Sequence, residues 1–120
     1  MAKFTADVVL DTPLDKIATA TRLSVCTGQP TNLSELAAMT LASVVVASGE
    51  FTKANGDVSG RKTSTPIKTN VPITASGDAT HLVLDDATDL LHGTTCALQA
   101  LTINGTVTIP SWNIEFRDPI

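Results

Sequence analysis

The sequence predicts a mainly β protein, a single antiparallel β-sandwich or barrel-like domain over residues 1–120 with one or two short helices near the N-terminus. Three observations lead to this fold class. From Arg61 onward, short segments rich in Val, Ile and Thr alternate with polar residues, which is typical of strands. Turn residues recur about every ten positions, a spacing found in sandwiches. The 120 residues, 42% of them hydrophobic, supply enough apolar matter for one core.

The first helix is expected in DTPLDKIATA, residues 11–20. Thr12 can cap it, and Pro13 then occupies the first helical position, where its missing N–H costs nothing. Leu14 and Ile17 fall on one face of such a helix. We therefore predict a short helix that begins at Thr12 and covers an apolar surface.

The next segments are expected to form a strand, a helix and a further β segment. TRLSVCTG alternates apolar and polar residues and predicts a strand. QPTNLSELAAM predicts a second helix capped by Thr31 or Asn32. From Thr40 to Phe51 a run of β-branched residues favours a strand, although the pattern also fits a buried helix.

Strands are expected throughout the rest of the chain. Two prolines, Pro66 and Pro72, make KTSTPIKTNVPITASG an edge strand or a strand broken by a bulge, because proline cannot donate to a ladder. ATHLVLDD and LLHGTTCALQAL read as further strands. Asn104-Gly105 is the strongest two-residue hairpin signal in the chain. TVTIPSWNIEF then supplies one or two closing strands.

The stretch NGDVSGRK begins at Asn55 like half of a calcium-binding loop. An EF-hand loop needs a bidentate acid at its twelfth position, and counting from Asn55 that position holds Pro66. A turn explains the residues better, since Gly56 and Gly60 permit positive φ and the short polar side chains can bond their own backbone. We expect a turn here and no metal.

Composition argues against two classes of partner. The net charge of −4 is the wrong sign for a phosphate backbone, and an aromatic content of 3% without tyrosine leaves little for base stacking. We therefore expect no nucleic-acid partner. No apolar run is long enough to span a bilayer, and the N-terminus does not read as a signal peptide, so we expect synthesis in a cytoplasm and no membrane partner.

Few residues are candidates for catalysis or ligand binding. His81 and His92 are the only histidines, and no nucleophile elbow, HExxH or phosphate loop occurs. The acidic turn containing Asp85, Asp86 and Asp89 could hold a loosely bound cation, but a solvated loop tip is the simpler interpretation. We expect no enzyme activity and no cofactor.

Cys26 and Cys96 lie far apart in the sequence, each flanked by small or apolar residues. Buried or half-buried thiols on strands are the expected state. A disulfide, within the chain or between subunits, stays open as an alternative.

Four phrases resemble one known family when taken together: LDKIATATRLSVCTGQPT, GDVSGRK, ATHLVLDD and TVTIPSWNIEFRDP. They are similar to a family of small proteins encoded among the structural genes of tailed bacteriophages. The likeness spans most of the chain, although LDKIATA lacks the aromatic residue expected in the first helix. It implies a virion protein.

Within that family, the expected role is a capsid decoration, or cement, protein. Such a protein would bind the major capsid protein or other virion proteins, and would form a homo-oligomer, for which a trimer is one option. A neck, collar or tail component is the first alternative. A binding module that is not packaged is the second, and a small hydrolase the last.

The chain ends are the expected contact segments. An extended N-terminal arm over residues 1–10 and a C-terminal tail over residues 117–120 lack turn signals that would tie them back to the domain. The candidate interface residues are Phe4, Val8, Leu10, Arg117 and Ile120. An ordinary first strand that contains Phe4, Val8 and Leu10 is the competing interpretation.

Overall fold

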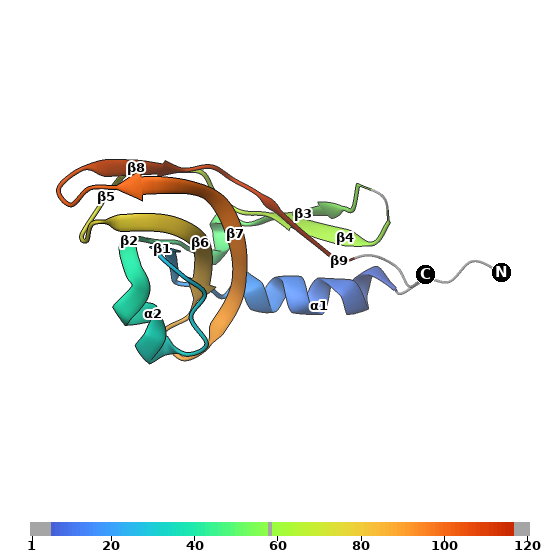
Figure 1. Ribbon diagram of the computed structural model, residues 1–120. Helices are drawn as coiled ribbons and strands as arrows, with labels where there is room; N and C mark the ends of the chain where they lie inside the picture. Colours follow the sequence, from blue (N-terminus) through green and yellow to red (C-terminus); the bar gives the residue numbers. More distant parts are fainter. Residues whose placement is uncertain (1–5, 58, 117–120) are drawn as a thin grey trace.

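A computed structural model describes residues 6–57 and 59–116 (Figure 1). It contains two α-helices, one 3₁₀ turn and nine strands in this part of the chain. In chain order the elements are α1 (Asp7–Ile17), β1 (Arg22–Cys26), α2 (Leu33–Met39), β2 (Thr40–Val45), η1 (Ser48–Glu50), β3 (Thr52–Asn55), β4 (Arg61–Ser64), β5 (Lys68–Pro72), β6 (Gly77–Asp85), β7 (Leu90–Leu101), β8 (Thr106–Ile109) and β9 (Asn113–Phe116).

The strands form three antiparallel sheets with the orders β2-β1-β6-β7, β3-β4-β9 and β5-β8. An isolated bridge between Ala42 and Ile73 connects the first sheet to the end of β5. The four-stranded sheet and β5-β8 therefore curve around a common interior (Figure 1). The predicted fold class, a mainly β sandwich-like domain with two short helices, is confirmed.

The molecule is elongated, with principal extents of 54 × 26 × 25 Å. Its long dimension arises because α1 and the β3-β4-β9 sheet lie side by side and project from the barrel-like body (Figure 1). We call this projection the arm. One apolar core runs through both parts, since Leu14 of α1 and Ile114 of β9 belong to the same buried cluster as Leu23 and Leu84 of the body.

Helix α1 begins earlier than expected. It starts at Asp7 rather than after Thr12, and Pro13 lies inside it. The extended conformation expected for residues 1–10 is wrong for Val8 and Leu10, and so is the competing first strand, because both residues are helical. Leu10, Leu14 and Ile17 form one buried stripe. Burial of this stripe against the sheet outweighs the local cost of an internal proline.

The second helix and the strands around it agree with the sequence. Asn32 caps α2 by accepting a hydrogen bond from the backbone N–H of Glu35 at 2.9 Å. The segment after Thr40 is the strand β2 rather than a buried helix, and it is followed by the turn η1 before Phe51.

The proline-rich segment also behaves as expected. Pro66 lies between β4 and β5, and Pro72 ends β5. The β5-β8 pairing is irregular between Lys68 and Val71, which is the predicted bulge.

The prediction of a hairpin at Asn104-Gly105 is correct for the turn but wrong for the pairing of the strands. Asn104 has a φ of 73°, and the Gly105 N–H donates to the Thr102 carbonyl at 3.1 Å, so a tight turn is present. Yet the strands on either side do not pair with each other, since β7 pairs with β6 and β8 pairs with β5. The turn instead bonds to Ile73 through the Asn104 N–H and the Gly105 carbonyl.

The stretch from Asn55 to Lys62 connects β3 to β4 as a turn, as predicted. Gly60 has a φ of 74°. Gly56 is required for a different reason, because a Cβ there would collide with the Ser59 carbonyl and with Glu115 Oε1. The Asp57 carboxylate accepts from Lys62 Nζ at 2.6 Å, so that side chain binds across the turn instead of to its own backbone.

Candidate assembly surface

Three exposed apolar side chains belong to the two elements that form the arm, near the two ends of the described chain. Val8 and Val9, in the first turn of α1, are 76% and 57% exposed, and Phe116, the last residue of β9, is 36% exposed. The start of α1 and the end of β9 lie at the same end of the molecule (Figure 1). We call Val8, Val9 and Phe116 the apolar tip. Both ends of the described chain therefore lie on the arm, and each end carries exposed apolar residues.

Arg61 connects the two elements that carry the tip. It lies opposite Phe116 in the β4-β9 ladder, and its Nε donates to Asp11 Oδ1 at 2.9 Å. Lys53 of β3 adds a second ion pair to the helix, with Nζ 2.7 Å from Asp15 Oδ1. This hydrogen bond raises the pKa of Lys53. Exposed pairs of this kind contribute little stability, but both of them connect α1 to the β3-β4-β9 sheet.

The predicted interface residues differ in their exposure to solvent. Val8 is exposed at the apolar tip, as a contact residue must be. Leu10 is only 8% exposed and packs within its own chain, which makes it a poor interface candidate. Phe4, Arg117 and Ile120 lie outside the described residues.

Sequence reasoning missed Val9 and Phe116 as surface residues. Phe116 lies two residues after Ile114 in β9, but only Ile114 is buried. Because β9 projects beyond the barrel-like body, its last residue has no opposing sheet. No local sequence signal marks that position.

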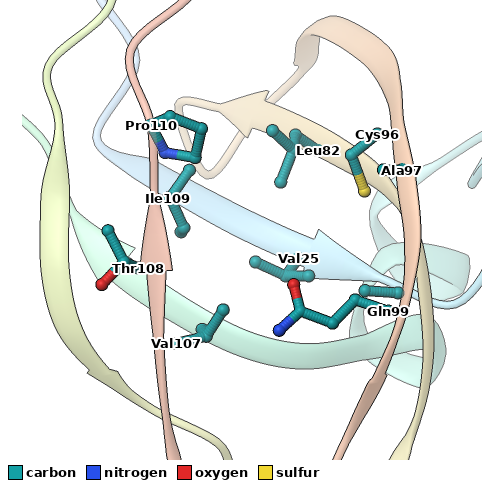
Figure 2. A pocket seen from close by; sticks show the side chains of 10 residues that line it. Val25, Leu82, Cys96, Ala97, Gln99, Val107, Thr108, Ile109 and Pro110 are labelled. Atoms are coloured by element: carbon teal, nitrogen blue, oxygen red, sulfur yellow. The ribbon is translucent and has the colours of Figure 1, made fainter.

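A second apolar feature lies in the barrel-like body, between β7 and β8. It is a pocket of about 170 Å³ that we call the β7–β8 groove (Figure 2). Its rim is formed by β7 on one side and β8 on the other, and β1 and β6 form the floor. The residues that line it include Val25, Leu82, Cys96, Gln99, Val107 and Ile109.

The acidic turn is more ordered than expected. Asp85 is fully buried and accepts two hydrogen bonds from Arg22, Nε to Oδ1 at 3.0 Å and Nη2 to Oδ2 at 3.2 Å. Asp86 accepts from the N–H groups of Asp89 and Thr88, which lowers its pKa. The expected solvated tip is therefore wrong for Asp85, whose carboxylate holds the end of β6 to β1.

The two histidines lie in different settings. His81 Nδ1 is 2.8 Å from the Thr80 hydroxyl. The His92 ring stacks on Trp112, with centroids 6.4 Å apart, and its partial burial lowers the pKa of the imidazole. Stacking on an indole in a half-buried position accounts for His92 as a packing residue.

The His92 environment predicts a pH dependence of stability. Its pKa is depressed below the ordinary 6.5 in the folded state, so the unfolded chain binds the proton more readily. Stability should therefore fall as the pH drops below 6.5. When the pH is lowered from about 7.5 to about 5.5, the Tm of the His92→Gln variant should fall by roughly 2 °C less than the Tm of the wild type. Equal losses measured by calorimetry would contradict the assignment.

Both cysteines are free thiols on strands, Cys26 buried in β1 and Cys96 half-buried in β7. The expected state is confirmed. Burial raises the pKa of Cys26 to about 11, and it raises the pKa of Cys96 as well.

This difference predicts selective labelling. Because a thiolate is the reacting form and Cys26 is inaccessible, a maleimide at about pH 8 should modify Cys96 alone in the folded, dilute monomer. In denaturant both thiols should react. Mass spectrometry of the labelled chain gives the number of modified thiols. The Cys96→Ser substitution should abolish labelling of the folded form. Rapid modification of Cys26 without denaturant would show that the barrel-like body opens.

Over the described residues, no three His, Cys, Asp or Glu side chains are grouped so that they could hold a metal ion. Likewise, no helix in that part of the chain is both long and apolar enough to cross a membrane. Comparison with protein-family models, curated proteins and solved structures found no match for this chain.

Proposed function

We propose that this protein is a structural component of a tailed-bacteriophage virion, and that it binds the outer capsid shell as a decoration subunit in contact with the major capsid protein. Two lines support the proposal. The first is the resemblance of LDKIATATRLSVCTGQPT, GDVSGRK, ATHLVLDD and TVTIPSWNIEFRDP to phage structural proteins. The second is the shape of the molecule and the position of its exposed apolar residues.

One observation carries the proposal. In an elongated body, the start of α1 and the end of β9 lie together at one end, beside the apolar tip of Val8, Val9 and Phe116. A subunit built in this way can attach by one end and leave the barrel-like body to stand above a surface or to reach its neighbours. Attachment buries the tip, and residues 117–120, which follow Phe116 in the sequence, can add backbone hydrogen bonds to the same contact.

Each contact needs to provide only modest free energy. Burying an exposed Val or Phe side chain contributes about 1.5–3 kcal/mol, and this must offset the cost of ordering the subunit. Subunits that also touch one another bind the shell as a linked array, so the effective affinity of the array exceeds that of one contact. Stabilisation of the shell then follows from cross-linking neighbouring capsid subunits.

Quantitative mass spectrometry of purified particles tests the proposal. A decoration subunit should be present at on the order of hundreds of copies per particle, since it follows the shell lattice. A count of roughly six or twelve would instead assign it to a neck, collar or tail ring with closed symmetry. Absence from washed particles would overturn the virion role and leave a binding module that is not packaged.

A further inference from the structure

We propose that the β7–β8 groove receives the N-terminal segment, residues 1–5, of a second copy of this chain, which adds as a strand between β7 and β8. The inference rests on the proposed role in assembly and deepens it, because it names the contact that would link one subunit to the next. It follows from the pairing of the strands, the lining of the groove and the reach of the segment.

The groove lies between two strands that each have one edge without a strand partner in the described part of the chain. Among residues 6–57 and 59–116, β7 pairs only with β6, and β8 pairs only with β5. The facing edges of β7 and β8 therefore border the groove without pairing to each other (Figure 2). Backbone groups along such edges are ready partners for an added strand.

The β7 edge is irregular where it meets the groove. Ala79 pairs with Gln99 and His81 pairs with Thr95, so that Thr80 of β6 stands opposite residues 96–98 of β7. Leu98, which lies in this irregular stretch, is 70% exposed.

The groove suits an apolar side chain. Val25 and Leu82 form its floor, Val107 and Ile109 line the β8 side, and a volume of about 170 Å³ is large enough for one aromatic ring. Gln99 extends its amide from β7 over the pocket (Figure 2). That amide can donate to or accept from the backbone of an added strand.

The N-terminal segment has a matching pattern. In the sequence MAKFT, Ala2 and Phe4 would share one face of a strand, and Lys3 and Thr5 the other. Phe4 would then fill the pocket while Lys3 faces solvent. The C-terminal residues, RDPI, fit less well, because Asp118 would bring a carboxylate to an apolar site and Pro119 cannot donate to a ladder.

Helix α1 runs from the outer end of the arm toward the barrel-like body (Figure 1), and its 11 residues cover about 16 Å. Five extended residues span at most about 17 Å, so a segment that turned back along α1 would be used up before it lay in the groove of its own molecule. We therefore assign the segment to another copy. The proposed contact therefore joins two different surfaces. A contact of this type closes into a ring, such as a trimer, when the rotation that relates one copy to the next divides a full turn evenly.

Cys96, which lines the groove, gives a direct test. Single cysteines are placed at positions 2 to 5 as Ala2→Cys, Lys3→Cys, Phe4→Cys and Thr5→Cys in the full-length chain, and each purified protein is concentrated and mildly oxidised. The side chains at positions 2 and 4 would face the groove, so those variants should give disulfide-linked dimers several-fold more efficiently than the Lys3→Cys and Thr5→Cys variants.

Each variant is repeated with Cys96→Ser, which should abolish the dimers. Dimers that form equally at all four positions, persist without Cys96 or do not form at all would overturn the strand-addition contact. The outcome is independent of the copy number in purified particles. Failure of this contact and failure of the proposed virion role are therefore distinguishable.

Discussion

The Val8→Asp variant should remain folded but bind particles that lack the protein about 100-fold more weakly than the wild type, because a carboxylate would be buried without a partner at the apolar tip. Val8 is 76% exposed in the first turn of α1, so no internal packing is lost. An acid in the first turn is also favourable for the helix. A sedimentation assay with purified protein and protein-free particles measures the change.

The chain offers a matched control. Val45 is also a valine, is also 76% exposed, and lies at the end of β2 in the barrel-like body. Val45→Asp adds the same charge to the same exposed residue type away from the tip, and should bind particles like the wild type. If Val8→Asp and Val45→Asp bind equally well, the apolar tip is not the attachment surface.

The Leu14→Ala variant should lower the free energy of unfolding by about 2–5 kcal/mol, the usual cost of removing a fully buried leucine side chain. Leu14 has no exposed surface and joins α1 to the core shared by the arm and the barrel-like body. A loss of stability of this size should lower the Tm by on the order of 10 °C. Urea unfolding followed by circular dichroism gives the value.

Leu98→Ala is the matched comparison, since Leu98 is 70% exposed in β7. The same truncation there should change stability by less than about 0.5 kcal/mol. A small effect of Leu14→Ala, similar to that of Leu98→Ala, would mean that α1 does not pack against the arm sheet in solution.

Helix α1 shows why its start was misjudged from the sequence. Pro13 is tolerated in a first turn, and that local rule placed the helix start at Thr12. The apolar stripe continues back to Leu10, four residues before Leu14, and this longer stripe is the signal that identifies the true helix. Tertiary burial decided the outcome over local preference.

Local turn signals predicted turns well but not strand partners. Asn104-Gly105 forms the expected turn, and Pro66 and Pro72 limit β5 as expected. The pairing of β8 with β5, however, depends on the curvature of the whole barrel-like body, which a two-residue signal cannot report. The same limit applies to Phe116, whose exposure follows from the projection of the arm.

The groove could not be inferred from the sequence at all. Cys96 and Val107 come from strands that are neighbours in the chain, and a hairpin signal between those strands predicts that they pair. Only the tertiary arrangement reveals that the strands part and leave apolar side chains between them. Arg22 and Asp85 give a parallel case, since their ion pair connects positions that no spacing rule brings together.

Imaging of the virion with and without this protein tests the central claim most directly. Difference density between the two particles should appear at repeated positions on the outer shell. Each feature should be elongated, consistent with a body 54 Å long, and should touch the shell by one end. Density confined to the neck or tail, or no difference between the two particles, would contradict a capsid decoration subunit.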